Sequence, residues 1–425
     1  MFDFFESENT VDSRQDPGGL YLPDATECMR CGLCVSQCPT YQLFQTYEES
    51  PRGRVKTLGK ILLDDQTIDV DELTHLNNCL QCRACETVCP SQMAYGRLFD
   101  QAQARLSEGL KISIVARLAF RLVEIKNLRR ALLPFIRVYI RSGLQSLIRR
   151  SGLLDRLNLT AADHLAAVPA LAKLAEFYPT QLARQGKVGL FTGCLSDHFD
   201  RDSLKAAITL LNAIGYDVWV PSEQTCCGAI HQHNGQQAKA LFFADQNKLV
   251  FNGLDVDAVV FTATGCGAML DEYAQDDQAG LLFQSRLFDI NEFLLQHWPE
   301  QQLMKSADLT VAVHEPCSQR NVLKNQAAVY DLLEKIPGLS VQSLPDNHLC
   351  CGSAGSYMLT HPDNANRLKA LKLDIIAQAK PDVVVSANFG CALHLNTGLS
   401  KVGVQVMHPL VLLADHLESG QQFPV

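Results

Sequence analysis

Cysteine is the residue type with the clearest capacity for chemistry in this chain, and eight of the sixteen cysteines form two identical runs near the N-terminus. Each run has the spacing C-x2-C-x2-C-x3-C and is followed by proline. Three thiolates spaced in this way can bind one iron-sulfur cubane, and the fourth, which follows a turn, reaches the other cluster. The two runs therefore predict two 4Fe-4S clusters. The predicted ligands are Cys28, Cys31, Cys34 and Cys89 for cluster 1, and Cys79, Cys82, Cys85 and Cys38 for cluster 2.

A zinc-stabilised scaffold is the alternative for these runs, because zinc also binds C-x2-C pairs and takes four thiolates. Zinc sites seldom need a third evenly spaced cysteine or a closing Cys-Pro, so the pattern favours clusters that pass single electrons. The same region carries Arg52 and Arg54. Their guanidinium groups could offset cluster charge or attract an acidic partner, and a solvated basic turn is the plainer interpretation.

The other eight cysteines form a second pattern, which occurs twice. In each copy a β-branched run ends at a cysteine, a Cys-Cys-Gly follows, and a further strand-like run ends at a last cysteine. The nearly constant offset between copies indicates a tandem duplication of one α/β domain. Each copy predicts a tentative four-thiolate metal or redox site, although free cysteines are often only small buried apolar residues. Copy one contributes Cys194, Cys226, Cys227 and Cys266, and copy two contributes Cys317, Cys350, Cys351 and Cys391.

The rest of the sequence must position these two groups of cysteines. The 425 residues are 47% hydrophobic, which is enough for several buried cores. The predicted fold is multidomain and combines α+β and α/β parts. The predicted segments are an N-terminal tail at 1–20, a helical two-cluster ferredoxin-like domain at 21–110, a basic amphipathic helical linker at 111–185, and two tandem α/β cysteine-rich domains at 186–305 and 306–425.

Residues 111–156 form a basic segment with eleven lysines or arginines and two acidic residues, although the whole chain has a net charge of -9. Apolar residues spaced three and four apart from Ile114 to Leu132 predict a helix, which Pro134 should break or kink. Basic amphipathic helices can be a solvated surface, dock an acidic subunit or lie on anionic lipid. The excess charge favours a partner or a membrane surface.

Several classes of function receive no support from the sequence. The acidic start of the chain lacks the features of a signal peptide, and no uncharged apolar stretch has membrane-spanning length. So many thiols are then expected in a reducing cytoplasm, bound to metal rather than paired as disulfides. The negative charge disfavours nucleic acid as a partner. No dinucleotide fingerprint or P-loop occurs, so no flavin is expected in this chain.

The twin ferredoxin motif followed by two cysteine-rich domains resembles the family of iron-sulfur subunits of bacterial glycolate oxidase, along essentially the whole chain. The segments PDNHLCCGSAGSYMLTHPD, ATGCGAMLDEY and ANFGCALHL carry this resemblance. The wider family includes the iron-sulfur subunits of lactate oxidation systems, of anaerobic glycerol-3-phosphate dehydrogenase and of heterodisulfide reductase.

The resemblance implies an electron-transfer subunit of an oxidoreductase complex. An FAD-containing 2-hydroxy-acid dehydrogenase partner would oxidise glycolate or a related acid, and the quinone pool would receive the electrons. The expected location is cytoplasmic and peripheral, on the inner face of the cytoplasmic membrane, with residues 111–156 as the contact. The alternatives are a subunit of a D-lactate or glycerol-3-phosphate dehydrogenase complex, or a thiol/disulfide enzyme like heterodisulfide reductase.

The end of each copy differs from the heterodisulfide reductase pattern. That pattern ends in C-x-x-C, whereas here Met269 and His394 occupy the last position. Disulfide chemistry on a five-cysteine cluster is therefore less expected, and the copies could hold one or two further iron-sulfur clusters or none. His394 could replace a thiolate ligand, and a structural role is the plainer alternative. Three other histidines could move protons or only form hydrogen bonds, namely His231, His233 and His348.

Overall fold

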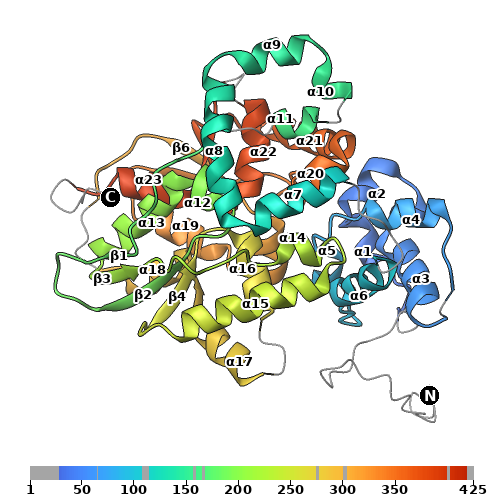
Figure 1. The fold of residues 1–425 in the computed structure, drawn as a ribbon, viewed down its shortest axis with the longest axis horizontal. Helices are drawn as coiled ribbons and strands as arrows, with labels where there is room; N and C mark the ends of the chain where they lie inside the picture. The colour runs from blue at the N-terminus through green and yellow to red at the C-terminus, as the bar shows by residue number, and fades with distance from the viewer. Residues whose placement is uncertain are drawn as a thin grey trace.

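The computed structural model describes residues 28–64, 66–107, 114–156, 159–164, 168–273, 277–299, 304–399 and 403–418. The predicted tail at 1–20 lies outside these residues. The described residues form a helical N-terminal part, a helical connecting part and two units with a β-sheet each (Figure 1). This agrees with the mixed helical and α/β fold class expected from the sequence.

The N-terminal part consists of short helices whose connecting loops carry the first eight cysteines. Helices α3 and α6 pack through a buried cluster that includes Leu58 and Phe99. Helix α3 begins sharply, because the Ser50 hydroxyl caps it by accepting a hydrogen bond from the amide of Gly53. The helices are α1 (Leu33–Ser36), α2 (Pro39–Phe44), α3 (Pro51–Leu62), α4 (Val70–Asn77), α5 (Ala84–Thr87) and α6 (Tyr95–Ser107), with a 3-10 turn η2 (Tyr47–Glu49).

The connecting part departs from its predicted helix boundaries. Ile125 has an extended backbone and separates two helices where the apolar spacing predicts one. The Arg129 guanidinium donates hydrogen bonds to the carbonyls of Leu122 and Val123, which the helix end leaves without backbone partners. The sequence predicted a break or a kink at Pro134, and the second helix is not broken there, because it continues through this proline to Arg141. The helices are α7 (Ile114–Glu124), α8 (Lys126–Arg141), α9 (Leu144–Arg150), α10 (Leu153–Arg156) and α11 (Thr160–His164).

The first sheet has the strand order β1-β3-β2-β4-β5. Strand β1 pairs antiparallel with β3, and the other neighbours are parallel. The strands are β1 (Phe177–Tyr178), β2 (Gly186–Phe191), β3 (Tyr216–Trp219), β4 (Ala258–Phe261) and β5 (Leu287–Asp289). The helices are α12 (Ser196–Phe199), α13 (Arg201–Ala213), α14 (Ala229–Gln232), α15 (Gln237–Asn252), α16 (Thr264–Asp271), α17 (Gln278–Ser285) and α18 (Ile290–His297).

The second sheet repeats the parallel part of the first, with the order β7-β6-β8-β9. All of its neighbouring strands are parallel. The strands are β6 (Thr310–His314), β7 (Ser340–Ser343), β8 (Val383–Ser386) and β9 (Gln405–Met407). The helices are α19 (Ala327–Leu333), α20 (Tyr357–Thr360), α21 (Pro362–Ala379), α22 (Phe389–Leu399) and α23 (Pro409–Asp415), with a π-helical turn η3 (Ser318–Leu323).

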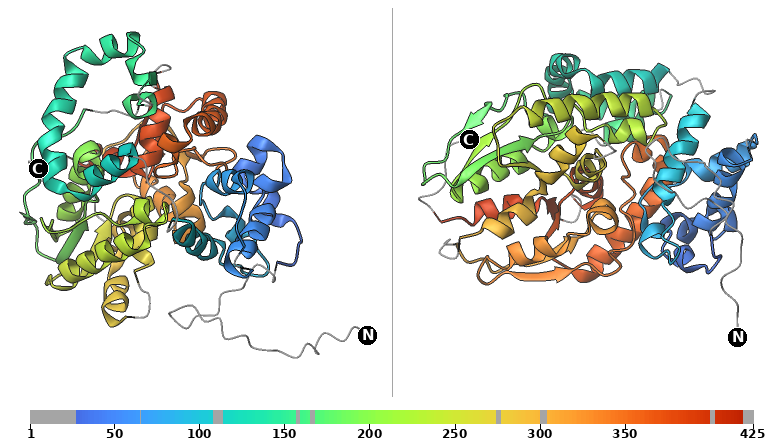
Figure 2. Two further views of the ribbon diagram at one scale, coloured as in Figure 1. Left: turned by 45° about the vertical axis from the view of Figure 1, so that its right-hand side comes forward. Right: turned by 90° about the horizontal axis from the view of Figure 1, so that it is seen from below.

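The two units share one apolar core. Helix α13 of the first packs on α23 of the second, and α18 packs on α19, so each unit offers its partner the same two helices. Leu204 and Leu210 belong to the same buried cluster as Leu410 and Leu413. The N-terminal part lies against both units at one end (Figure 2). This arrangement brings the cysteines of both patterns toward one region.

Candidate metal centres

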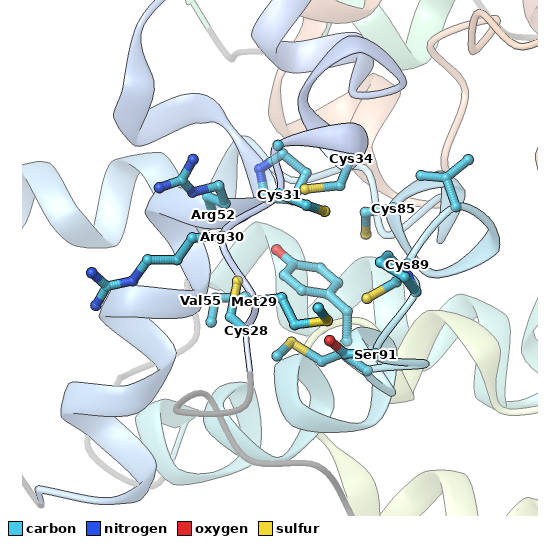
Figure 3. Close-up of a pocket in the computed structure, with 16 residues that line it drawn as sticks. Cys28, Met29, Arg30, Cys31, Cys34, Arg52, Val55, Cys85, Cys89 and Ser91 are labelled. Carbon is cyan, nitrogen blue, oxygen red and sulfur yellow. The ribbon is translucent and has the colours of Figure 1, made fainter. Parts of the chain in front are cut away.

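The first cysteine-lined pocket has a volume of about 40 Å³ and lies in the N-terminal part (Figure 3). Gly32 follows its second cysteine and adopts φ +85°, a conformation that glycine tolerates without strain. Burial and the nearby Cys28 raise the pKa of Cys34 to about 11, so a bound metal would have to supply the charge that keeps this thiol ionised. Arg52 lies at the rim. The cysteines that line the pocket are Cys28, Cys31, Cys34, Cys85 and Cys89.

The second pocket has a volume of about 20 Å³ and shares Pro51, Cys85 and Tyr95 with the first. Burial raises the pKa of both Cys82 and Cys85 well above the ordinary thiol value. Buried thiols of this kind bind soft metal ions as thiolates, which suits an iron-sulfur cluster. The two pockets are compatible with the predicted ligand sets, whose assignment stays a prediction. The cysteines that line the second pocket are Cys38, Cys79, Cys82 and Cys85.

A buried arginine lies beside the second pocket. Arg54 is 1% exposed, pairs with Glu49 at 2.5 Å, and donates to the Thr40 hydroxyl at 2.9 Å and the His75 carbonyl at 2.7 Å. Its Nη1 also lies 3.8 Å from the sulfur of Cys38. The sequence left open a solvated turn or a role in offsetting cluster charge; Arg54 is not solvated, and its guanidinium lies between Glu49 and the Cys38 sulfur.

The eight cysteines of the two units line one shared cavity of about 220 Å³. In each Cys-Cys-Gly the glycine has a positive φ, +93° at Gly228 and +86° at Gly352. Its amide donates to the sulfur of the first cysteine of the pair at 3.4 Å in both copies. Cys82 of the second pocket also lines this cavity. The shared lining is Cys194, Cys226, Cys227 and Cys266 from copy one, and Cys317, Cys350, Cys351 and Cys391 from copy two.

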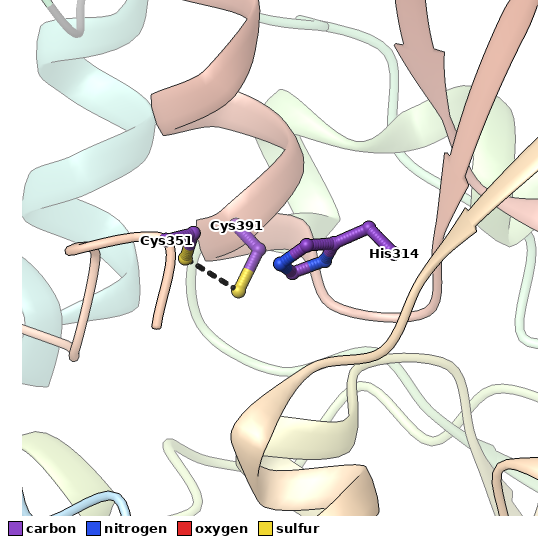
Figure 4. Close-up of side chains that lie close together, drawn as sticks. All are labelled: His314, Cys351 and Cys391. Atoms are coloured by element: carbon purple, nitrogen blue, oxygen red, sulfur yellow. Dashed lines mark hydrogen bonds between the residues drawn. The ribbon is translucent and has the colours of Figure 1, made fainter. Parts of the chain in front are cut away.

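Copy two contains a histidine that the sequence analysis missed. The His314 ring and the sulfurs of Cys351 and Cys391 offer three ligand atoms within 4.8 Å of one another (Figure 4). Burial lowers the pKa of His314 to about 3, so its imidazole is neutral at pH 7. A histidine at the end of a buried strand, where copy one has Phe191, was the available signal.

The other predicted histidines take structural places. His394 is buried, its Nε2 lies 3.3 Å from the carbonyl oxygen of Ala365, and it does not line the cavity.

His231 contacts Glu124 of α7 at 3.2 Å. His233 lines the cavity, its Nδ1 lies 2.5 Å from Oε1 of Gln81, and burial lowers its pKa to about 4. Neutral histidines of this kind orient neighbouring groups, and the structure adds nothing to a proton role. His348 lies 3.9 Å from Asp346 and outside the cavity lining.

Comparisons with known proteins give the arrangement its context. Family models match as a 4Fe-4S dicluster domain at 24–93, as the linker region of the glycolate oxidase iron-sulfur subunit at 111–171, and as a cysteine-rich domain at 188–271 and again at 311–396. The probable glycolate oxidase iron-sulfur subunit of Bacillus subtilis (strain 168) is 33% identical, over 96% of this chain and 96% of its own length. The chain belongs to the glycolate oxidase iron-sulfur subunit family.

Other members and relatives agree with this family. The glycolate oxidase iron-sulfur subunit of Escherichia coli (strain K12) is 31% identical over 92% of this chain and 94% of its own length. The lactate utilization protein A of Geobacillus thermodenitrificans (strain NG80-2) is 28% identical, and matches 52% of this chain and 96% of its own length. The chain is therefore an iron-sulfur component of an oxidoreductase complex. Within the described residues, no helix is long and apolar enough to cross a membrane.

Proposed function

We propose that this chain carries electrons from an FAD-containing 2-hydroxy-acid dehydrogenase subunit, of glycolate oxidase type, toward the quinone pool. The observation that carries the proposal is the series of cysteine-lined spaces. The first pocket shares Cys85 with the second, and the second shares Cys82 with the large cavity. Two 4Fe-4S clusters, with the ligands predicted from the sequence, would stand next to each other and next to the two copies.

The N-terminal part is fixed to both copies at the point where the series continues. Asn321 of copy two donates from Nδ2 to the carbonyl oxygen of Cys82 at 2.7 Å. Arg83, the next residue, forms an ion pair with Glu272 of copy one. Contacts of this kind hold a donor and an acceptor at constant separation, which a relay of single electrons requires. The copies would then form the exit or docking end of the relay.

Substrate oxidation is placed on a partner chain, because the sequence has no dinucleotide fingerprint. Glycolate is the first candidate substrate, since the relatives that match over nearly their whole length are glycolate oxidase iron-sulfur subunits. A lactate-oxidising complex is the second candidate, supported by the partial match to a lactate utilization protein. Dye reduction by the co-purified complex with glycolate, lactate or 2-hydroxyglutarate distinguishes them, and a complex that oxidises none of the three contradicts the proposal.

A substitution at the second pocket tests the relay itself. Cys82→Ser in the assembled complex should block quinone reduction, while a dye that takes electrons directly from the partner flavin is still reduced. The two N-terminal clusters account for about eight irons and about eight acid-labile sulfides per chain, and this content should fall in the variant. Unchanged quinone reduction in this variant, or zinc without sulfide in the wild-type chain, would contradict the electron-carrier function.

We also propose that α8 and α9 rest on an anionic membrane surface. Phe135, Val138 and Leu147 are 71%, 63% and 65% exposed, so these two helices present several large apolar side chains to solvent. Arg141 of α8 and Arg150 of α9 are also exposed. Apolar side chains that enter the headgroup region, flanked by arginines, are the features of helices that lie on anionic lipid.

Vesicle sedimentation tests this surface. Phe135→Asp should reduce binding to phosphatidylglycerol vesicles by roughly tenfold, since it removes an apolar anchor and adds a repelled charge. Leu249→Asp is a matched control, because Leu249 is also 71% exposed but lies on α15, away from α8 and α9 (Figure 1). Equal binding by both variants would refute the membrane contact and leave an acidic partner subunit as the occupant.

A further inference from the structure

His314 places a nitrogen ligand next to the cysteines of copy two. Its ring and the sulfurs of Cys351 and Cys391 lie within 4.8 Å of one another, and all three side chains are buried. The two sulfurs are 3.0 Å apart. In Figure 4 the imidazole projects from the end of β6 toward Cys391. Imidazole and thiolate both bind iron, so this group has the chemistry of a metal centre.

Neighbouring polar groups orient these ligands. Nδ1 of His314 lies 3.1 Å from the hydroxyl of Ser386, a contact that fixes the ring and leaves Nε2 as the metal-binding atom. The Asn388 amide donates to the sulfur of Cys391 at 3.4 Å. Hydrogen bonds to ligand sulfurs are one of the means by which proteins set the potential of an iron-sulfur centre. The surroundings therefore resemble the supporting contacts of a bound centre.

Copy one has no nitrogen at the same place. Phe191 ends β2 as His314 ends β6, and Phe261 of β4 occupies the register position that Ser386 has in β8. Both phenylalanines are 2% exposed. Phe191 and Phe261 belong to the buried cluster that contains Cys194, Cys226 and Cys227. In copy two an imidazole lies beside the sulfurs of Cys351 and Cys391. At this position copy two therefore offers a possible metal ligand, and copy one does not.

Copy two also borders the second pocket of the N-terminal part. Leu80 and Cys82 share a buried cluster with Cys350, and Asn321 holds the backbone of Cys82. Replacement of thiolate by imidazole raises the potential of an iron-sulfur centre. A centre with one imidazole ligand would therefore take an electron from a neighbouring all-cysteine cubane, which is oxidised by one electron as the copy-two centre is reduced.

We propose that His314 is a nitrogen ligand of an iron-sulfur centre in copy two, which it forms with the thiolates of Cys317, Cys350, Cys351 and Cys391. This inference rests on the proposed electron-transfer function and adds a third centre to the relay. At the equivalent position copy one has Phe191, which has no nitrogen to offer, and His394 contacts a backbone carbonyl instead.

The test uses the full chain, produced with ¹⁵N-labelled histidine and purified anaerobically. Hyperfine spectroscopy of the paramagnetic centres should show coupling to a histidine nitrogen in the wild-type chain. His314→Gln should abolish this coupling, whereas the control His394→Gln should keep it, because the His394 ring contacts the Ala365 carbonyl and is not part of the group that His314 forms with Cys351 and Cys391. His314→Cys should bind iron without the nitrogen coupling, which separates loss of the ligand from loss of the fold.

Iron and sulfide content provide the second measurement. The wild-type chain should contain more than about eight irons, and Cys351→Ser should lose the excess while both N-terminal cluster signals remain. A coupling that persists in His314→Gln, a wild-type content of about eight irons, or zinc in copy two would overturn the inference and leave the proposed function intact. Absence of both N-terminal signals from the wild-type chain would overturn the proposed function itself.

Discussion

The two cysteine-rich copies have the same framework but different surroundings for their sulfurs. The four parallel strands of the first sheet have the same order as those of the second, and both Cys-Cys-Gly turns use a glycine with positive φ. Behind the sulfurs, copy one has Phe191 and Phe261, and copy two has His314 and Ser386. A duplicated fold therefore keeps the residues that shape its backbone, while the residues at the strand ends are free to acquire separate roles.

The copies also differ in how they hold the N-terminal part. Copy one holds it through the ion pair of Glu272 with Arg83 and through the hydrogen bond that Gln81 donates to the His233 carbonyl. Copy two holds it by a hydrogen bond from Asn321 to the Cys82 carbonyl and by the apolar contact of Leu80 and Cys82 with Cys350. Copy two thus contacts Cys82 itself, so substitutions at the contacts of the two copies should differ in their effect on electron transfer.

The largest difference is expected at the two glycines. A Cβ at Gly352 would lie 2.5 Å from the carbonyl oxygen of Ala365, whereas one at Gly228 would lie 3.1 Å from that of Ala240. Gly228→Ala should cost about 1–2 kcal/mol for the left-handed backbone, and Gly352→Ala about 2–5 kcal/mol because a steric clash is added. Urea denaturation of each variant measures this. Equal losses in the free energy of unfolding would mean that the backbone around Gly352 shifts enough to remove the steric clash.

The docking contacts should separate stability from electron transfer. Glu272→Gln removes a partly buried ion pair and should cost about 1–3 kcal/mol, while Asn321→Ala removes one neutral hydrogen bond and should cost about 1 kcal/mol. Quinone reduction by the complex should nevertheless fall more in Asn321→Ala, because this change releases the backbone of Cys82. A greater loss of the quinone-reduction rate in Glu272→Gln would indicate that the electrons pass to copy one instead of copy two.

The third difference is an opposite pH response at two equivalent helix caps, Asp289 of α18 in copy one and His408 of α23 in copy two. Burial raises the pKa of Asp289 to about 6, and burial lowers the pKa of the equivalent His408 to about 4. Stability from Asp289 is complete below about pH 4 and is lost as the pH rises through 6, whereas stability from His408 is complete above about pH 6.5 and is lost as the pH falls through 4.

Two cap variants check these signs. As the pH rises from 4 to 7, the free energy of unfolding of Asp289→Asn should increase by about 1–2 kcal/mol relative to that of the wild-type chain. For His408→Gln a similar relative increase should appear as the pH falls from 7 to 4. Thermal unfolding across this range measures both. Parallel curves for wild type and variant would show that the caps do not titrate as their burial implies.

Much of the candidate chemistry could be predicted because it is recorded in local spacing. The C-x2-C-x2-C-x3-C runs, the repeated Cys-Cys-Gly and the alternation of strands and helices involve residues close together in the chain. The family and the mixed fold class followed from them and were confirmed. The segment boundaries, the cluster ligands and the partner stay predictions.

Helix boundaries in the basic segment were predicted less well. The sequence alone gave one helix across Ile125 and a break or kink at Pro134, but α7 ends at Glu124 and α8 passes through the proline without a break. The deciding contacts come from the Arg129 side chain, which binds the carbonyls of Leu122 and Val123. A hydrophobic period cannot record such a contact, because it depends on how a charged side chain folds back on the preceding turn.

The sequence by itself determined which cysteines are grouped, that the cysteine-rich unit is duplicated, and that a basic helical segment joins it to the ferredoxin-like part. Only the tertiary structure decided that the cysteines of the two copies face one cavity, that Cys82 borders it, and that His314 meets Cys351 and Cys391. The reason is that cysteine spacing sets local turns, whereas residues far apart in the chain meet only where the two sheets and the N-terminal part pack together.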